Sequence, residues 1–165
     1  MNIPVVLKQA DIFSGVSHEQ LMRVASFCRV QDYEEGNIIF EENSTGKELF
    51  VIADGEVEIL VNPALVSHLP DTQIKPQVIA TMRRGQSFGE IALVDHGVRS
   101  AMARTSSSKA QLVIIPQDKL MNLCNEDPVL GFQLMYNLAQ DLSTKLRGSD
   151  FQIRGHFLKV RDKKI

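Results

Sequence analysis

The sequence lacks a surplus of basic charge, and this lack narrows the classes of partner. Its 18 lysine and arginine residues are balanced by 20 aspartate and glutamate residues, which gives a formal net charge of −2. Proteins that bind nucleic acid or anionic membranes through bulk charge carry a positive balance. A partner must therefore be inferred from a specific site and not from overall charge.

Long apolar runs are also missing, as is a secretory leader. A representative apolar run, the four residues 112–115, falls far below the roughly 20 residues that a membrane-spanning helix needs. The amino terminus lacks the charged and apolar blocks of a signal peptide. We therefore expect a cytoplasmic protein.

Cysteines are few and are not arranged as a metal-binding or redox motif. Cys28 and Cys124 each fall in an apolar pattern of helical spacing, and they form no CxxC pair. This arrangement favours two buried free thiols over a disulfide or a metal pair.

The 165 residues, of which 44% are hydrophobic, are enough for one domain with one sizeable core. Ser17 and Gln20 form a capping-box pattern, and the apolar residues after them share one helix face, so a helix is predicted at 17–28. From 30 to 116 short β-like runs alternate with glycines, which is typical of a sandwich or barrel. These runs lie at 37–40, 48–52, 56–61, 78–82, 100–103 and 111–115.

Two connections within this region are predicted from local signals. Asp54-Gly55 lies between two strand-like runs, and an Asp-Gly pair in that position is the strongest short-range signal for a β-hairpin with a type I′ turn. Residues 62–76 hold three prolines and little periodicity, which predicts an extended loop. Together the two signals delimit the strand-like run at 56–61.

The carboxyl-terminal part of the chain has a helical pattern and is predicted to form two helices within 117–148. Asp127-Pro128 begins the second, because an acidic cap followed by proline is a common helix start. A row of leucines then packs against the barrel or against a partner, and the spacing leaves both alternatives open: Leu130, Leu134, Leu138, Leu142 and Leu146. Gly148 is expected to end this helix and the domain at 1–148, leaving a basic tail at 149–165 that is interpreted as solvated rather than as a nucleic-acid arm.

The segment FGEIALVDHGVRSA at 88–101 is neither a regular strand nor a regular helix. Gly89 allows a turn and the close approach of another group, and the residues after Glu90 can form one helical turn with free N–H groups. Arg99 follows nine residues after Glu90 and offers a planar fork of donors to two phosphate oxygens. A carboxylate beside a phosphate is repulsive unless it accepts a hydrogen bond from a hydroxyl of the same ligand. A ribose phosphate satisfies both side chains.

This segment resembles the phosphate-binding cassette of the cyclic-nucleotide-binding domain family, which is found in kinase regulatory subunits, gated channels and bacterial catabolite activators. Residues 12–15, 35–40 and 53–57 are similar to other landmarks of that family, in the family's order. The resemblance implies a mainly β fold, an antiparallel eight-stranded β-roll similar to a jelly-roll barrel, with a short amino-terminal helix and two carboxyl-terminal helices. It also implies a 3′,5′-cyclic nucleotide as ligand, with cAMP favoured and cGMP as the second candidate.

The family's ligand-binding residues are carried over by their positions in the motif. Glu90 is expected to bind the ribose 2′-hydroxyl, and Arg99 the cyclic phosphate. The resemblance adds a phosphate cradle made by the backbone N–H groups of Ile91 and Ala92, the Ser100 hydroxyl beside Ala101, and the clearance at Gly89. Met82 and Phe88 are apolar wall of the site or plain core, and both interpretations stay open.

The resemblance further implies a non-catalytic mechanism without a cofactor. Ligand binding would favour one placement of the helix at 127–147, and Leu142 or Leu146 would cover the base. Only a short stretch follows Gly148, too little for the helix-turn-helix domain of catabolite activators. We therefore expect a stand-alone regulatory module in signal transduction that does not bind DNA. Its partners would be an unknown downstream protein or a second copy joined through the carboxyl-terminal helix.

Two alternatives come from other classes of protein. A metal-dependent enzyme on a cupin-type barrel needs histidines that converge on one metal ion, but the four histidines form no HxH pair: His18, His68, His96 and His156. The sequence therefore predicts no catalytic residue and no metal site. The second alternative is a family member that has lost its ligand and serves for dimerisation, and the intact Glu90 and Arg99 argue against it.

Overall fold

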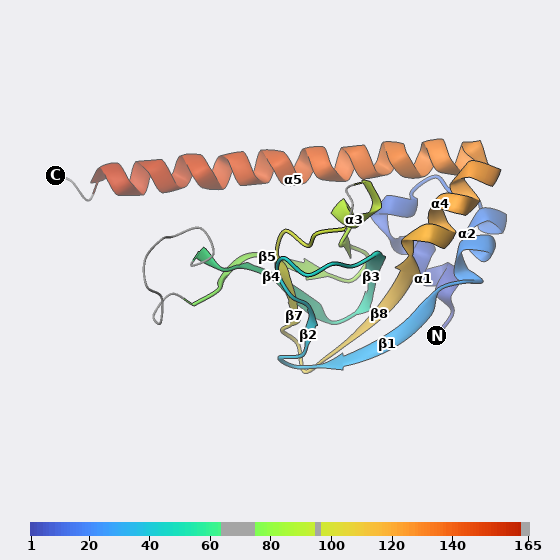
Figure 1. The fold of residues 1–165 in the computed structure, drawn as a ribbon, viewed down its shortest axis with the longest axis horizontal. Helices are drawn as coiled ribbons and strands as arrows, with labels where there is room; N and C mark the ends of the chain where they lie inside the picture. Colours follow the sequence, from blue (N-terminus) through green and yellow to red (C-terminus); the bar gives the residue numbers. More distant parts are fainter. Residues whose placement is uncertain (64–74, 95–96, 163–165) are drawn as a thin grey trace.

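The computed structural model describes residues 1–63, 75–94 and 97–162, which form a β-roll with helices at one end and one long helix along it (Figure 1). The roll consists of two antiparallel four-stranded sheets with the strand orders β1-β8-β3-β6 and β2-β7-β4-β5. The predicted antiparallel β-roll with flanking helices is confirmed. Its strands are β1 Arg29–Glu34, β2 Ile38–Phe40, β3 Glu48–Asp54, β4 Glu56–Val61, β5 Gln77–Arg83, β6 Ser87–Phe88, β7 Met102–Thr105 and β8 Lys109–Pro116.

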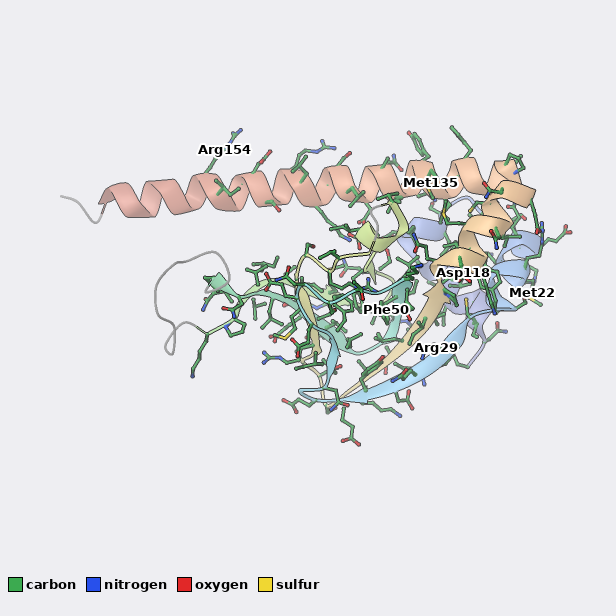
Figure 2. The ribbon with its side chains drawn as sticks, viewed as in Figure 1. Met22, Arg29, Phe50, Asp118, Met135 and Arg154 are labelled. Atoms are coloured by element: carbon green, nitrogen blue, oxygen red, sulfur yellow. The ribbon has the colours of Figure 1, made fainter. Side chains whose placement is uncertain are left out.

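Strands β3 and β8 are buried on both faces and separate two apolar cores. Successive side chains of a strand point to opposite faces, so each of these strands supplies both cores in alternation. The core inside the roll holds Phe50, Ile52, Leu112 and Ile114, and the core beneath the helices holds Leu49, Val51, Val113 and Ile115. Phe50 lies inside the roll (Figure 2). This double burial explains why both runs are continuously apolar in the sequence.

The helices at the end of the roll pack on the second core. They are α1 Ile3–Gln9, the 3-10 helix η1 Asp11–Phe13, α2 His18–Ala25 and α4 Gln117–Glu126. α2 begins as predicted, because Ser17 Oγ accepts from the backbone N–H of Gln20 while Gln20 Oε1 accepts from that of Ser17. It ends at Ala25 rather than at Cys28. α1 was not predicted, since seven residues give too short a periodic pattern.

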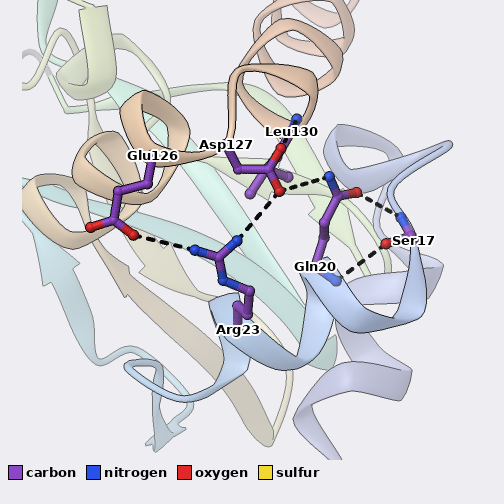
Figure 3. Close-up of polar contacts among 6 residues, drawn as sticks. All are labelled: Ser17, Gln20, Arg23, Glu126, Asp127 and Leu130. Carbon is purple, nitrogen blue, oxygen red and sulfur yellow. Dashed lines mark hydrogen bonds and ion pairs between the residues drawn. The ribbon is translucent and has the colours of Figure 1, made fainter.

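A polar network fixes the start of the long helix α5, Pro128–Asp162, to α2 (Figure 3). Asp127 Oδ1 accepts from the backbone N–H of Leu130 at 3.1 Å, and Asp127 Oδ2 accepts from Gln20 Nε2 at 3.0 Å. Arg23 forms ion pairs with Glu126 at 3.2 Å and with Asp127 at 3.4 Å. These hydrogen bonds, with that from Gln20 the strongest, lower the pKa of Asp127. The predicted helix start at Asp127-Pro128 is confirmed and is also a tertiary anchor.

The expectation that the helix ends at Gly148 is wrong. α5 continues through Gly148 to Asp162, so residues 149–162 are helical and not an aperiodic tail, and Figure 1 shows the helix reaching past the roll. A glycine inside a helix costs only about 1 kcal/mol relative to alanine, and no proline follows to stop the helix. The Ser149 hydroxyl donates to the Lys145 carbonyl at 3.1 Å across this point.

The hairpin predicted at Asp54-Gly55 is also wrong. β3 pairs with β8 and β6, whereas β4 pairs with β5 and β7, so the two strands beside the turn belong to different sheets. Gly55 has a φ of 83°, but Asp54 lies outside the left-handed region that a type I′ turn requires at both central positions. A bulge before Asp54 turns the chain from one sheet to the other.

Other local differences follow from weak or short patterns. β1 was not predicted because most of its side chains are exposed and show no apolar alternation, and β6 has only two residues. The run predicted at 100–103 is displaced to β7. Of the loop predicted at 62–76, residues 64–74 lie outside the described residues.

The thiols and the helices answer two further questions raised by the sequence. Cys28 is half-buried and Cys124 is buried, and both are free, which confirms the prediction of free thiols. Burial raises the pKa of Cys28 to about 12, so its thiol stays protonated and unreactive at neutral pH. In the described parts of the chain, no helix combines the length and the apolar character needed to cross a membrane.

Candidate functional site

A cavity of about 330 Å³ lies between the roll and α5 and contains most of the predicted site. Its lining includes every predicted ligand-binding residue except Ala92, which belongs to the short helix α3 Ile91–Val94 and whose side chain lies outside the described part. The lining residues are Phe40, Ile59, Ile79, Ala80, Met82, Phe88, Gly89, Glu90, Ile91, Val98, Arg99, Ser100, Ala101, Lys145, Gly148 and Ser149. The structure therefore brings together residues from β2, β4, β5, the 88–101 segment and α5.

Arg99 is buried in a slot between two glycine-containing loops. A Cβ atom added at Gly89 would lie 2.6 Å from Arg99 Nη1, and one added at Gly46 would lie 2.6 Å from Nη2. Gly89 also has a φ of 79°, a backbone conformation that residues other than glycine rarely adopt. The clearance predicted for Gly89 is thus occupied by the guanidinium group itself.

The guanidinium group of Arg99 is only partly satisfied by the protein. Nη1 donates to the Gly89 carbonyl at 3.2 Å and Nη2 to the Glu48 carbonyl at 2.9 Å, and the group lies 4.3 Å from the ring centroid of Phe40. Its Nε is buried and has no partner among the described residues. The side chain is 3% exposed, and this burial lowers the pKa of Arg99. The negative charges of Glu48 and Glu90 raise the same pKa but do not outweigh the burial. A guanidinium keeps its proton in proteins, so the slot presents a fixed cation with an unused donor.

Glu90 is buried beside this cation and pairs with a lysine from α5. Its residue exposure is 6%, and its Oε1 accepts from Lys145 Nζ at 2.8 Å. Lys145 Nζ also contacts Asp141 Oδ2 at 2.7 Å and donates to the Ser87 carbonyl at 3.2 Å. Burial would lower the pKa of Lys145, but Glu90 and Asp141 outweigh it and raise that pKa above its usual value. Lys145 lines the cavity and contacts Glu90, and the sequence analysis did not single it out.

The helix residues predicted to cover the base are not the ones that line the cavity. Leu146 is 64% exposed, and Leu142 packs against the core beneath the helices; Lys145, Gly148 and Ser149 face the cavity instead. A four-residue step advances about 40° beyond a full turn of a helix, so four steps from Leu130 to Leu146 rotate the row by about 160°. The periodicity counted from buried Leu134 and Leu138 would have indicated position 145.

The apolar wall of the cavity also belongs to the core of the roll. Met82 and Phe88 are 7% and 3% exposed and line the cavity, so both interpretations of these residues describe them. The Phe88 ring stacks on Phe50 with 5.1 Å between centroids. Ala101 is buried and Ser100 is exposed at the rim. Within the described ranges, no three His, Cys, Asp or Glu side chains gather as they would around a metal ion.

Comparisons with known proteins show which family and which relatives the chain resembles. Residues 30–127 match the family model described as cyclic nucleotide-binding domain. The chain is 27% identical to the cyclic AMP receptor protein of Thermus thermophilus over 147 residues, which are 89% of this chain and 62% of that protein. It is 25% identical over 112 residues, 68% of this chain, to the cGMP-dependent protein kinase 2 of Homo sapiens, of which the match covers 14%.

A solved structure agrees with the fold. The crystal structure of a cyclic nucleotide-binding domain from Methylobacillus flagellatus has a TM-score of 0.74 with this chain at 24% identity, covering 92% of this chain and 80% of the other. Both curated relatives are longer than the matched region, so the chain spans less than two thirds of their length.

Proposed function

Since the chain belongs to the cyclic nucleotide-binding domain family, we propose that it binds a 3′,5′-cyclic nucleotide in the cavity beneath α5 and acts as a non-catalytic sensor. The single observation that carries this proposal is Arg99, a buried cation at the cavity wall with an unused donor. Arg99 pairs with Glu48 Oε2 at 3.5 Å, but its Nε has no acceptor among the described residues, and a buried donor without an acceptor is costly unless a ligand or a water molecule supplies one. A cyclic phosphate carries one negative charge and two free oxygens, which suit this group.

The residues around Arg99 contact different parts of the ligand. Glu90 accepts from the ribose 2′-hydroxyl, which offsets the repulsion between its carboxylate and the phosphate. The backbone N–H groups of Ile91 and Ala92 and the Ser100 hydroxyl complete the phosphate contacts, and Met82 with Phe88 forms the apolar wall. cAMP is favoured over cGMP, although the relatives include a protein named for each nucleotide.

Binding would be relayed through α5. The helix is anchored at Asp127 and contributes Lys145, Gly148 and Ser149 to the cavity wall. A ligand held between the roll and α5 stabilises one helix placement in proportion to its differential affinity for the two placements. The output is a change in the position of α5 and not a chemical step.

Side-by-side titration with cAMP and cGMP tests this proposal. At a free ligand concentration of about 100 times Kd, binding to the native state alone adds about 2.7 kcal/mol to the free energy of unfolding. For a chain of this size we expect the midpoint of thermal unfolding to rise by about 5–10 °C. Calorimetric titration then gives the Kd of each nucleotide. No shift with either nucleotide, in a chain whose circular dichroism reports a folded β-roll, would favour the alternative of a family member without a ligand.

We also propose that α5 pairs with α5 of a second copy. Its exposed face carries apolar side chains at heptad positions on the side away from the buried leucines, and two positions of the same row are polar, Ser143 and Asp150. The apolar residues are Val129, Phe132, Tyr136, Ala139, Leu146 and Ile153, and Phe132 stacks on Tyr136 with 6.1 Å between ring centroids. The unbroken part of the row, from Val129 to Ala139, would form the centre of a two-stranded seam, and Figure 1 shows that the helix itself reaches past the roll.

Sedimentation of the wild type and of a double variant tests the pairing. We expect the wild-type chain to sediment as a dimer and the Phe132→Lys/Tyr136→Lys variant as a monomer. Burying two lysine charges per helix in the interface between the two α5 helices is unfavourable. Met22→Lys is the matched control, since Met22 on α2 is 52% exposed and Tyr136 is 53% exposed. A wild-type monomer at every concentration measured, or a double variant that stays dimeric, would contradict the proposal.

A further inference from the structure

Lys145 connects α5 directly to the segment that carries Glu90. The Lys145 ammonium group donates hydrogen bonds to Glu90 Oε1 and to the Ser87 carbonyl, and it also forms an ion pair with Asp141 Oδ2. Asp141 lies one turn earlier on α5, whereas Ser87 and Glu90 belong to β6 and the turn after it. Lys145 therefore contacts both α5 and the segment at 87–90 of the roll, and its position depends on where α5 lies over the roll.

Glu90 needs a cation because it is buried. Its side chain is 8% exposed, and a buried charge is stabilised when it pairs with a charge of opposite sign. Arg99 also attracts it, but no hydrogen bond joins the two side chains in the described structure. Lys145 is the group that contacts Glu90 at hydrogen-bond distance.

The contact uses one of the two carboxylate oxygens. Lys145 donates to Oε1, and no described residue donates to Oε2. With Oε1 occupied, Oε2 remains as an acceptor for a hydroxyl on a ligand in the cavity. The contact with Lys145 thereby fixes which carboxylate oxygen faces the ligand.

We propose that Lys145 is a positioning residue that orients the Glu90 carboxylate for the ligand's sugar hydroxyl, so that recognition of this hydroxyl requires α5 to lie over the cavity. This inference rests on the proposed function and specifies how the same site is regulated. By linkage, the hydroxyl must favour the placement of α5 in which Lys145 contacts Glu90. A ligand without the hydroxyl binds the cassette but couples weakly to the helix.

The experiment compares two ligands on matched variants. The Kd values of cAMP and 2′-deoxy-cAMP are measured by calorimetry for the wild type, Lys145→Met and Lys145→Arg. We expect the wild type to prefer cAMP by about 10- to 100-fold, the range for one hydrogen bond to a charged group. In Lys145→Met, which keeps an unbranched side chain one atom shorter and removes the charge, we expect the preference to fall below about threefold, mainly through weaker cAMP binding. Lys145→Arg keeps the charge and restores most of the preference.

Controls separate this role from general damage to the fold. Lys119→Met removes an exposed lysine from α4 and is expected to leave both Kd values unchanged. A purely structural role of Lys145 would weaken both nucleotides equally and leave their ratio at the wild-type value, and this result would overturn the inference. A wild type that binds neither cAMP nor cGMP would instead overturn the proposed function. If Lys145→Met is unstable by circular dichroism, Lys145→Gln replaces it with the same expected ratio.

Discussion

Arg99→Ala is expected to lower the affinity for the cyclic nucleotide by about 10²- to 10⁴-fold. Two charge-assisted hydrogen bonds to the phosphate, at about 1.5–3 kcal/mol each, account for this range. The substitution also frees the Glu48 and Gly89 carbonyls that the guanidinium now contacts, and these carbonyls can bond to water that enters the slot. We therefore expect the fold to persist while binding is lost, as measured by calorimetry and thermal unfolding of the same samples.

Arg104→Ala is the matched control for this loss. Arg104 lies on β7, pairs with Glu58 at 2.8 Å and does not line the cavity. It is partly exposed, so its removal changes the net charge of the chain by the same amount at little cost to stability. An Arg99→Ala protein that binds within about threefold of the wild type would show that the phosphate lies elsewhere.

Gly89→Ala is expected to abolish binding almost as completely, through the position of Arg99 and not through its charge. The added Cβ would lie 2.6 Å from Arg99 Nη1 and 3.1 Å from the Glu48 carbonyl oxygen, so the guanidinium must shift from its present position. A displaced guanidinium no longer aligns with two phosphate oxygens, and we expect the affinity to fall by about 100-fold or more. The Kd of the variant and its midpoint of thermal unfolding check this result.

Gly36→Ala separates backbone strain from the displacement of Arg99. Gly36 has the same φ of 79°, but a Cβ at this position meets no atom within 4 Å. Both variants therefore share the cost of a left-handed alanine, about 1–3 kcal/mol of stability, and only Gly89→Ala moves the arginine. Equal affinities of the two variants would contradict the role of Gly89 as clearance for Arg99.

The gathering of Gly89, Glu90 and Arg99 at one cavity could be predicted from sequence because its signals are local. Gly89, Glu90 and Arg99 lie within one short segment, and their side-chain chemistry already points to a sugar and a phosphate. The capping box at Ser17 and Gln20 is equally local, and it was found with its correct partners. Such features require only that neighbouring residues fold together, and they do not depend on how distant parts of the chain pack.

Features that depend on tertiary placement were missed. The Asp54-Gly55 turn was assigned to a hairpin because a dipeptide reports on local backbone angles and not on which sheet receives the next strand. Lys145 lies 55 residues from Glu90, and only the rotation of α5 over the roll brings the two together. A helix end is wrongly predicted at Gly148 because the sequence alone does not show how strongly the flanking turns stabilise a long helix.

The anchoring of α5 at one end makes this helix a lever. The fixed part of the helix extends from Asp127 to Leu138, whose side chain is buried in the core, and Lys145 lies seven residues beyond it, about 10 Å at 1.5 Å per residue. The far end at Asp162 lies 24 residues beyond Leu138, about 36 Å, more than three times as far. If this part of the helix pivots as a rigid rod, a shift of about 1 Å where Lys145 touches the cassette becomes a shift of about 3 Å at Asp162. The length of α5 beyond the roll would then convert a small rearrangement in the cavity into a larger displacement of the helix end.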